Sequence, residues 1–197
     1  MILAQGEYRY EIRRAGDLIA IEEERVEPRK LSGVRRSPDG ANRHEVRADL
    51  DDEERVLKVT VRYERGPFAR MATYEASGEF LRGRVSALAG SNDVTVKLGR
   101  FREIDADLVL FRALTIGHIR ARGEERWTGR VATIDPNTLV ATLQKQSCRR
   151  RDGAGRLWVY EPRMGDVEEI EIDADGRIVR RRDSRGTETV LISASGV

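Results

Sequence analysis

The sequence has little of several residue types, and the scarcest are the metal and disulfide ligands. Its 197 residues include one cysteine, Cys148, and two histidines, His44 and His118. A single cysteine excludes an intrachain disulfide, and a structural zinc site needs several ligands. The two histidines lie far apart, without the i+2 or i+4 spacing of a metal motif. We therefore expect neither a metal nor another cofactor.

Aromatic residues are also scarce, at 6% of the chain. The hydrophobic share is 39%, which is lean but above the disordered regime, and charged residues make up 36%. A core of this composition consists mostly of Val, Ile and Leu. Many charges beside a lean core are typical of a sheet with one dry face and one wet face.

Targeting signals are missing as well. The start, Met1 to Gln5, is too short and uncharged for a signal peptide. No run approaches the roughly 18 apolar residues of a membrane-spanning helix. We therefore expect a bacterial protein of the cytoplasm with no integral membrane segment.

Charge of one sign is not concentrated anywhere. The 36 basic and 34 acidic residues nearly cancel, to +2, and neither a basic arm nor an acidic tail stands out. Four of the 36 basic residues are lysines, which leaves 32 arginines, a bias typical of a GC-rich genome. Nucleic-acid binding by counterion release needs clustered cations, so nucleic acid is excluded as the expected partner.

What the sequence has is alternation of apolar and polar residues with a period of two. Leu57, Val59, Val61 and Tyr63 share one face of an extended segment. Gly- and Asp-rich turns such as 173–176 separate consecutive segments of this kind. The pattern predicts an antiparallel meander of roughly ten to twelve strands in a single domain, residues 1–197.

Two stretches break the alternation. Residues 28–42 are rich in Pro, Gly, Ser and Arg and predict a long mobile loop. Residues 104–120 are the most apolar stretch, with Leu108, Phe111 and Leu114 at helical spacing. They predict a strand end that runs into one short helix.

A meander with one apolar helix has two plausible architectures. We expect a mainly β fold, in which a curved open or half barrel wraps around the short helix. The alternative is a closed up-and-down barrel with the helix as a plug. Both architectures create a concave apolar interior, where ligand pockets commonly form.

Several residues of the central and C-terminal segments are candidates for ligand binding. Asp105 and Asp107 could form a paired-acid or metal site, although an N-cap aspartate explains the same residues better. His118 could stand at the mouth of a pocket or in the core. The full set of candidates is Asp105, Asp107, Phe111, Arg112, His118, Arg120, Trp127, Trp158 and Tyr160.

The C-terminal third resembles a known family. The run LWVYEPR at 157–163, followed by VEEIEIDADGRIV at 167–179, is similar to the closing strands of the bacterial glycolipid-binding family. The stretch 101–114 is similar in style to the central segment of that family. The resemblance implies a half-barrel shaped like the bacterial lipoprotein carriers, and lipid binding. We assign no functional residue of that family to a position in this sequence.

We expect a non-enzymatic binding protein for a lipid, glycolipid or other apolar ligand in the concave face of the sheet. No catalytic residue is assigned, because GxSxG, P-loop, GxGxxG and HExxH motifs are absent. One alternative is an enzyme acting on a small apolar or glycosidic compound through Asp105, Asp107 and His118. Another is a protein-interaction module that uses a sheet edge, and a homodimer stays open.

Overall fold

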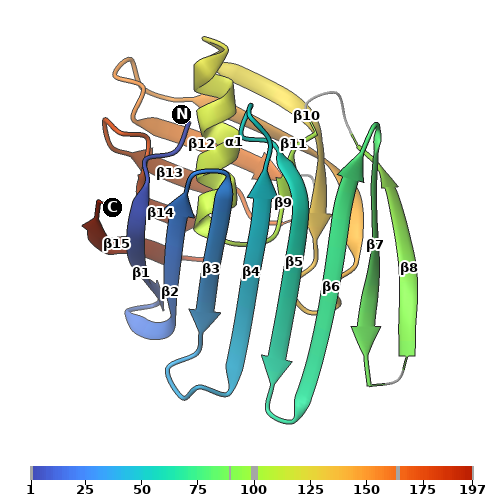
Figure 1. The fold of residues 1–197 in the computed structure, drawn as a ribbon. Helices are drawn as coiled ribbons and strands as arrows, with labels where there is room; N and C mark the ends of the chain where they lie inside the picture. The colour runs from blue at the N-terminus through green and yellow to red at the C-terminus, as the bar shows by residue number, and fades with distance from the viewer. Residues whose placement is uncertain (1, 89, 99–101, 163–164, 197) are drawn as a thin grey trace.

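The computed structural model describes residues 2–88, 90–98, 102–162 and 165–196. Within these residues the chain forms one helix and fifteen strands, and all the strands belong to a single sheet (Figure 1). The elements are β1 (Gly6–Arg14), β2 (Asp17–Glu27), β3 (Lys30–Arg36), β4 (Asn42–Leu50), β5 (Val56–Arg65), β6 (Phe68–Ser77), β7 (Phe80–Ala87), β8 (Gly90–Lys97), β9 (Ile104–Asp105), α1 (Val109–Ala121), β10 (Arg126–Ile134), β11 (Ala141–Arg150), β12 (Leu157–Pro162), β13 (Glu168–Ile172), β14 (Ile178–Asp183) and β15 (Thr187–Ser195).

Strand β1 shows why these segments are extended. Tyr8, Tyr10 and Ile12 are buried on one face, whereas Glu7 and Arg9 are exposed on the other. Successive side chains of a strand point to opposite faces, so this alternation gives the sheet a dry side and a wet side. The charged residues that dominate the composition occupy the wet side.

The sheet is a meander in which chain neighbours are also neighbours in space. Its order runs from β8 back to β1, continues with β15, and ends at β9. The pairs are antiparallel except for a short parallel bridge between β9 and β10. The first and last strands, β1 and β15, pair with each other, so both ends of the chain lie in the middle of the sheet.

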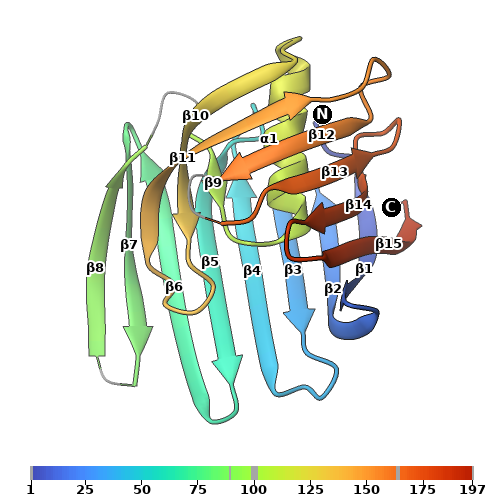
Figure 2. The same ribbon diagram turned by 180° about the vertical axis from the view of Figure 1, so that it is seen from behind.

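The described strands do not close into a barrel, because β8 and β9 remain the two ends of the strand order. Figures 1 and 2 show the sheet curving around α1, with β3 to β8 on one side of the helix and β10 to β13 on the other. This confirms the predicted open or half barrel around one short helix. The fully closed barrel is not formed.

Helix α1 fills the concave side of the sheet. Its residues from Val109 to Ile119 are buried, apart from the half-buried Gly117. A helix that is buried all round is enclosed by protein rather than lying on a surface. The strand end that precedes it is β9, which confirms the strand-to-helix prediction for residues 104–120.

The predicted mobile loop at 28–42 is wrong, because these residues contain β3. This strand pairs along its length with β2 and β4, and Leu31 and Gly33 face the core. Gly33 is not a turn residue: a Cβ at this position would lie 2.6 Å from Cδ1 of Leu108. The glycine therefore permits close packing, and the turns are confined to the ends of the strand. The strand is one reason why the observed strand number exceeds the expected one.

Candidate functional site

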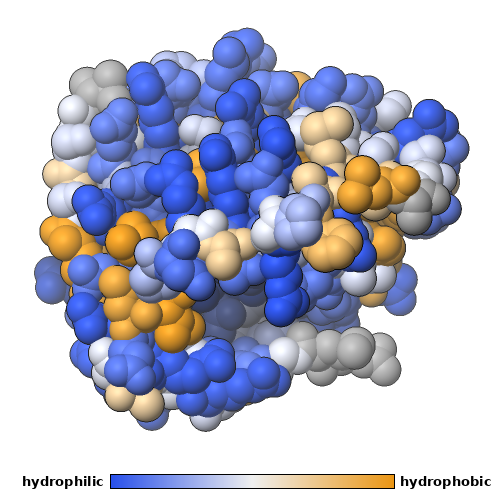
Figure 3. Space-filling view, turned by 90° about the horizontal axis from the view of Figure 1, so that it is seen from below, coloured by the Kyte–Doolittle hydropathy of each residue, from blue (hydrophilic) through white to orange (hydrophobic). Residues whose placement is uncertain are grey.

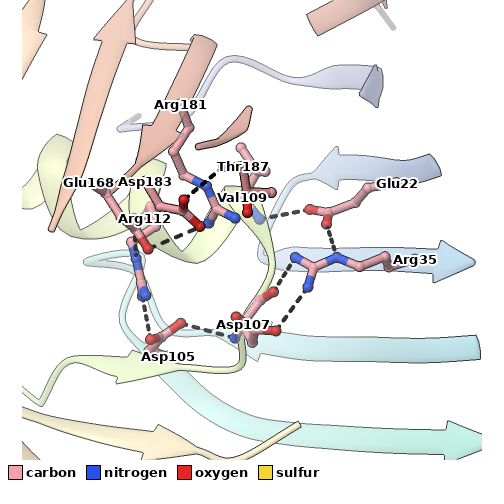
Figure 4. A network of polar contacts seen from close by, with 10 residues as sticks. All are labelled: Glu22, Arg35, Asp105, Asp107, Val109, Arg112, Glu168, Arg181, Asp183 and Thr187. Carbon is pink, nitrogen blue, oxygen red and sulfur yellow. Dashed lines mark hydrogen bonds and ion pairs between the residues drawn. The ribbon is translucent and has the colours of Figure 1, made fainter. Parts of the chain in front are cut away.

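A network of charged side chains surrounds the start of α1 on the concave side of the sheet (Figure 4). Arg112, in the first turn of the helix, forms an ion pair with Asp105 and donates from Nε to Glu168 at 3.1 Å. Its guanidinium also lies over the ring of Tyr160, 4.4 Å from the centroid. Three of the candidate ligand residues, Asp105, Arg112 and Tyr160, therefore meet, but they contact one another.

Asp107 has a different arginine partner. Arg35 of β3 donates from Nη1 to the Asp107 carboxylate at 2.8 Å and from Nε to Glu22 at 2.6 Å. The Asp107 backbone N–H donates to Asp105 Oδ1 at 3.0 Å, which links the two halves of the network (Figure 4). Burial opposes ionisation of Asp107, but the charge of Arg35 prevails and holds its pKa below the ordinary value.

The predicted N-cap aspartate is wrong. The N-cap position is Leu108, which offers no capping side chain, and Asp107 has a φ of +61°. The cap comes from another strand: Glu22 and Glu24 of β2 accept hydrogen bonds from the backbone N–H groups of Val109 and Leu110, at 2.7 and 2.8 Å. Two carboxylates at the positive end of the helix dipole thus fix α1 to the sheet.

These two carboxylates differ in protonation. Burial opposes the ionisation of Glu22, but the Arg35 guanidinium lowers its pKa below the ordinary value. Burial and the neighbouring charge of Glu22 raise the pKa of Glu24 well above that value. Burial, helped by Arg35, lowers the pKa of His44, which stands beside Arg35 in the sheet register. The surroundings therefore favour the charged form of Glu22, the protonated form of Glu24 and the neutral form of His44.

The arrangement is that of a structural network. Each of its arginines touches a carboxylate, and Arg181 adds a further contact to Glu168 at 3.9 Å. Buried charges persist in proteins when they are paired and hydrogen-bonded in this way. The alternative of an enzyme requires Asp105, Asp107 and His118 to converge, and only the two aspartates are together here.

His118 and Arg120 lie near the other end of α1. His118 is 8% exposed, and its Nδ1 is 3.2 Å from Oε1 of Glu103. Burial opposes protonation, but the bond to Glu103 prevails and raises the pKa of His118 above its usual value. Arg120 is exposed, and its guanidinium lies beside Gly176 in the turn between β13 and β14. Neither residue reaches the network at the start of the helix.

The remaining candidates belong to the packed interior. The large side chains of Phe111, Trp158 and Tyr160 are at most 1% exposed, and Trp127 is 4% exposed. They join one continuous hydrophobic core around α1. The nearby Cys148 is also buried, which raises the pKa of its thiol to about 12. The interior around the helix is thus filled by the protein's own side chains.

Two kinds of site are not found in the described parts of the chain. No three of the described His, Cys, Asp and Glu side chains are grouped so that they could hold a metal ion. Within the described residues, no helix is long and apolar enough to span a membrane.

An apolar groove lies at the lower end of the curved sheet, where α1 does not reach (Figure 1). Its volume is about 430 Å³, within the range of small-molecule sites. Phe68 and Leu88 are the most exposed large apolar side chains of the described residues, at 67% and 83%. Figure 3 shows this end of the molecule, with apolar atoms among polar ones. The lining consists of Tyr63, Arg65, Phe68, Ala69, Arg70, Ala87, Leu88 and Asn137.

The sheet register places the groove on the concave face. Tyr63 pairs with Arg70, which pairs with Ala87, and these positions continue the inward row of buried Ala72 and Tyr74. The opposite wall is the turn between β10 and β11. Tyr74 holds that turn, since its hydroxyl donates to the Leu139 carbonyl at 2.7 Å.

Sequence reasoning missed this groove. The signal that could have found the groove lies in the hairpin at 65–70. There Phe68 continues the row of inward-facing residues of β6 past the end of the part that the helix covers. A larger depression of about 520 Å³ on the outer face, across β1 to β4 and β15, is charged instead. Two of its arginines, Arg25 and Arg47, pair with its carboxylates Glu7 and Glu45, at 3.6 and 2.7 Å, so acidic and basic side chains both line it.

No family model and no curated protein sequence matches this chain. Solved structures with a similar fold include the following two. A DUF1089 family protein from Pseudomonas aeruginosa has a TM-score of 0.60 and 18% identity, over 85% of this chain and 90% of that one. A beta-barrel-like protein of the domain of unknown function DUF1849 from Brucella abortus has a TM-score of 0.64 and 8% identity, over 99% and 98% of the two chains. The fold therefore defines an open, barrel-like β protein of a type found in bacteria.

Proposed function

We propose that this protein is a non-enzymatic binding protein for a lipid, glycolipid or similar apolar ligand, held in the groove at the open end of the curved sheet. The observation that carries the proposal is the exposure of Phe68 and Leu88 in a concave apolar site of about 430 Å³. Large apolar side chains that gather in an exposed concavity mark ligand or interaction sites.

The groove also fits the proposal energetically. Burial of apolar surface contributes roughly 25 cal/mol per Å², before the cost of ordering the ligand is subtracted. A single acyl chain laid along Tyr63, Phe68 and Leu88 removes apolar surface of both partners from water. The filled interior around α1 supports this choice of site, because the small cavity beside Leu110 has a volume of only about 20 Å³.

The likeness of the C-terminal strands to the glycolipid-binding family supports the same ligand class. The half barrel that this family implies agrees in shape with the sheet around α1. A bacterial cytoplasmic location belongs to the proposal as well, and the single buried thiol of Cys148 suits a reducing compartment. Fractionation of cells that express the protein tests the location.

A fluorescence titration with the neutral apolar dye Nile red tests the proposed function. We expect saturable binding to the wild type, displacement of the dye by a single-chain glycolipid, and at least tenfold weaker binding to Phe68→Glu. The matched control is Met71→Glu, because Met71 lies on the outer face of the same strand and is 50% exposed. Absence of saturable binding, or equal losses in both variants, would overturn the proposal.

Native mass spectrometry of the protein purified from bacterial cells is an independent test. We expect an added mass of a lipid or glycolipid on the wild type and its loss in Phe68→Glu. A wild-type spectrum of apo-protein alone, together with no displacement of Nile red, contradicts lipid binding. The same spectra reveal whether the protein forms the homodimer that the sequence leaves open.

A further inference from the structure

We propose that the ligand of the groove carries an anionic head group, which Arg65 and Arg70 bind. The ligand class is then a single-chain amphiphile with an acidic head, such as a long-chain carboxylate. This inference rests on the proposed function, because it assigns the polar end of the ligand whose apolar part the groove accepts. Three observations on charge support it.

The first observation is the charge of the lining. Among the residues that the structure describes, two arginines line the groove, and no aspartate or glutamate does. The chain as a whole has almost as many acidic as basic residues, 34 against 36. A concave site with two cations and no anion therefore departs from the rest of the molecule, and it complements an acidic ligand.

The second observation is that these arginines lack the carboxylate partners that most other arginines have. On the outer face of β5, the strand that contains Arg65, Arg62 forms an ion pair with Glu64 at 2.5 Å. Among the described residues the Arg65 guanidinium has no hydrogen-bond or ion-pair partner, and Arg70 has only the carbonyl of Asn137, at 2.7 Å from Nη1. Most of the N–H donors on both guanidinium groups are therefore available to a ligand.

The third observation is the position of the two arginines in the register. Arg65 pairs with Phe68, and Arg70 pairs with Tyr63, across the β5–β6 ladder. The two arginines are thus diagonal neighbours on one face of the sheet. Long side chains in diagonal positions lie within reach of each other. Phe68 and Tyr63 stand between them, so an acidic head on the arginines leaves its chain against the aromatic rings.

The physical consequence is that the groove should bind an amphiphile with a carboxylate head group more tightly than one with an alcohol head group. Hydrogen bonds from a guanidinium to a carboxylate are shorter and about twice as strong as neutral ones. Arg65 and Arg70 are exposed, so dissolved salt screens this contact. An amphiphile with a neutral head gains the same apolar burial but loses the charge-assisted bonds.

Isothermal titration with decanoate and with 1-decanol at neutral pH tests the inference. The two probes share a chain length and differ in head-group charge. We expect the wild type to bind decanoate at least tenfold more tightly than decanol, and the ratio to fall as salt is raised. Equal affinities for the two probes would overturn the anionic head group while leaving the proposed function intact. Failure of both probes to bind would count against the proposed function itself.

The variant Arg65→Gln assigns the preference to the groove. We expect it to lose about tenfold in affinity for decanoate and to retain its affinity for decanol. Arg82→Gln is the control, because Arg82 is exposed on the outer face of β7 and makes no ion pair with a described residue. If Arg65→Gln keeps the acid–alcohol ratio of the wild type, or if Arg82→Gln lowers that ratio equally, Arg65 does not bind the head group.

Discussion

The two ends of the half barrel use the same sheet face in opposite ways. Beside α1, the concave side is packed with buried side chains, and its charges are paired. Phe111 is 1% exposed, and Arg112 has two carboxylate partners. At the lower end, the inward-facing side chains are exposed, and the arginines lack a carboxylate partner among the described residues. Phe68 is 67% exposed, and Arg65 lines a groove whose described lining has no carboxylate. The comparison teaches that the helix, rather than the sheet, decides where the concave face becomes a site.

The largest expected effect separates two phenylalanines. We expect Phe111→Ala to cost about 3–5 kcal/mol of unfolding free energy, because it leaves a cavity beside α1. Phe68→Ala should change stability by no more than about 0.5 kcal/mol, because an exposed side chain loses little burial. Urea denaturation followed by circular dichroism measures both values. A comparable loss in Phe68→Ala would mean that the lower end is packed like the rest of the core.

A second pair of variants compares two arginines. Arg112→Met should cost about 3–5 kcal/mol, because it leaves Asp105 and Glu168 buried without a cation. Arg65→Met should leave stability within about 0.5 kcal/mol of the wild type. The shift in the thermal unfolding midpoint reports both. If Arg112→Met is as stable as the wild type, the network does not hold the helix.

A smaller effect distinguishes the two carboxylates that cap α1. Glu22→Gln should cost about 1.5–3 kcal/mol, because a charged partner of Arg35 and of the helix is lost. Glu24→Gln should cost much less, because the raised pKa of Glu24 favours its protonated form and the amide resembles that form. Denaturant unfolding at pH 7 checks both, and equal losses would contradict the difference in protonation.

The same pair has opposite dependences on pH. The pKa of Glu24 is higher in the folded state, so the folded protein binds more protons and its stability falls as pH rises from the ordinary glutamate range through the folded pKa. We expect Glu24→Gln to remove this fall. The pKa of Glu22 is lower in the folded state, so its contribution is present above the ordinary glutamate range and is lost as pH decreases through the folded pKa. Unfolding curves across this range separate the two.

The smallest expected effect concerns the contact between β3 and the start of α1. Gly33→Ala should cost about 1–3 kcal/mol, because the added methyl group would lie 2.6 Å from Leu108. Gly153→Ala is the control, because a Cβ there meets nothing within 4 Å. Thermal unfolding of both variants checks this. Equal midpoints would show that Leu108 can move aside.

Much of the fold could be predicted from local pattern. The alternation in β5 and in the hairpin of β13 and β14 reveals strands directly, because one face of each is buried. The apolar stretch 104–120 revealed the helix because Leu108, Phe111 and Leu114 recur at helical spacing in the most apolar part of the chain. Strand β3 was missed because its glycine looks like a turn residue, although it serves packing against Leu108.

The candidate site was harder to predict because it depends on contacts between distant segments. Asp105, Asp107 and Arg112 lie in one network, but their partners Arg35 and Glu168 lie more than fifty residues away in the chain. A local pattern shows which side chains face inward. It does not show which of them are paired or covered.

The sequence by itself therefore determined a one-sided antiparallel sheet with a single helix, because period-two burial and short turns are local properties. Tertiary structure alone decided which inward positions are filled. It placed two carboxylates of β2 at the start of α1, and it left Phe68, Arg65 and Arg70 beyond the reach of the helix. The physical reason is that a cavity belongs to the space between elements, and that space is set by how they pack.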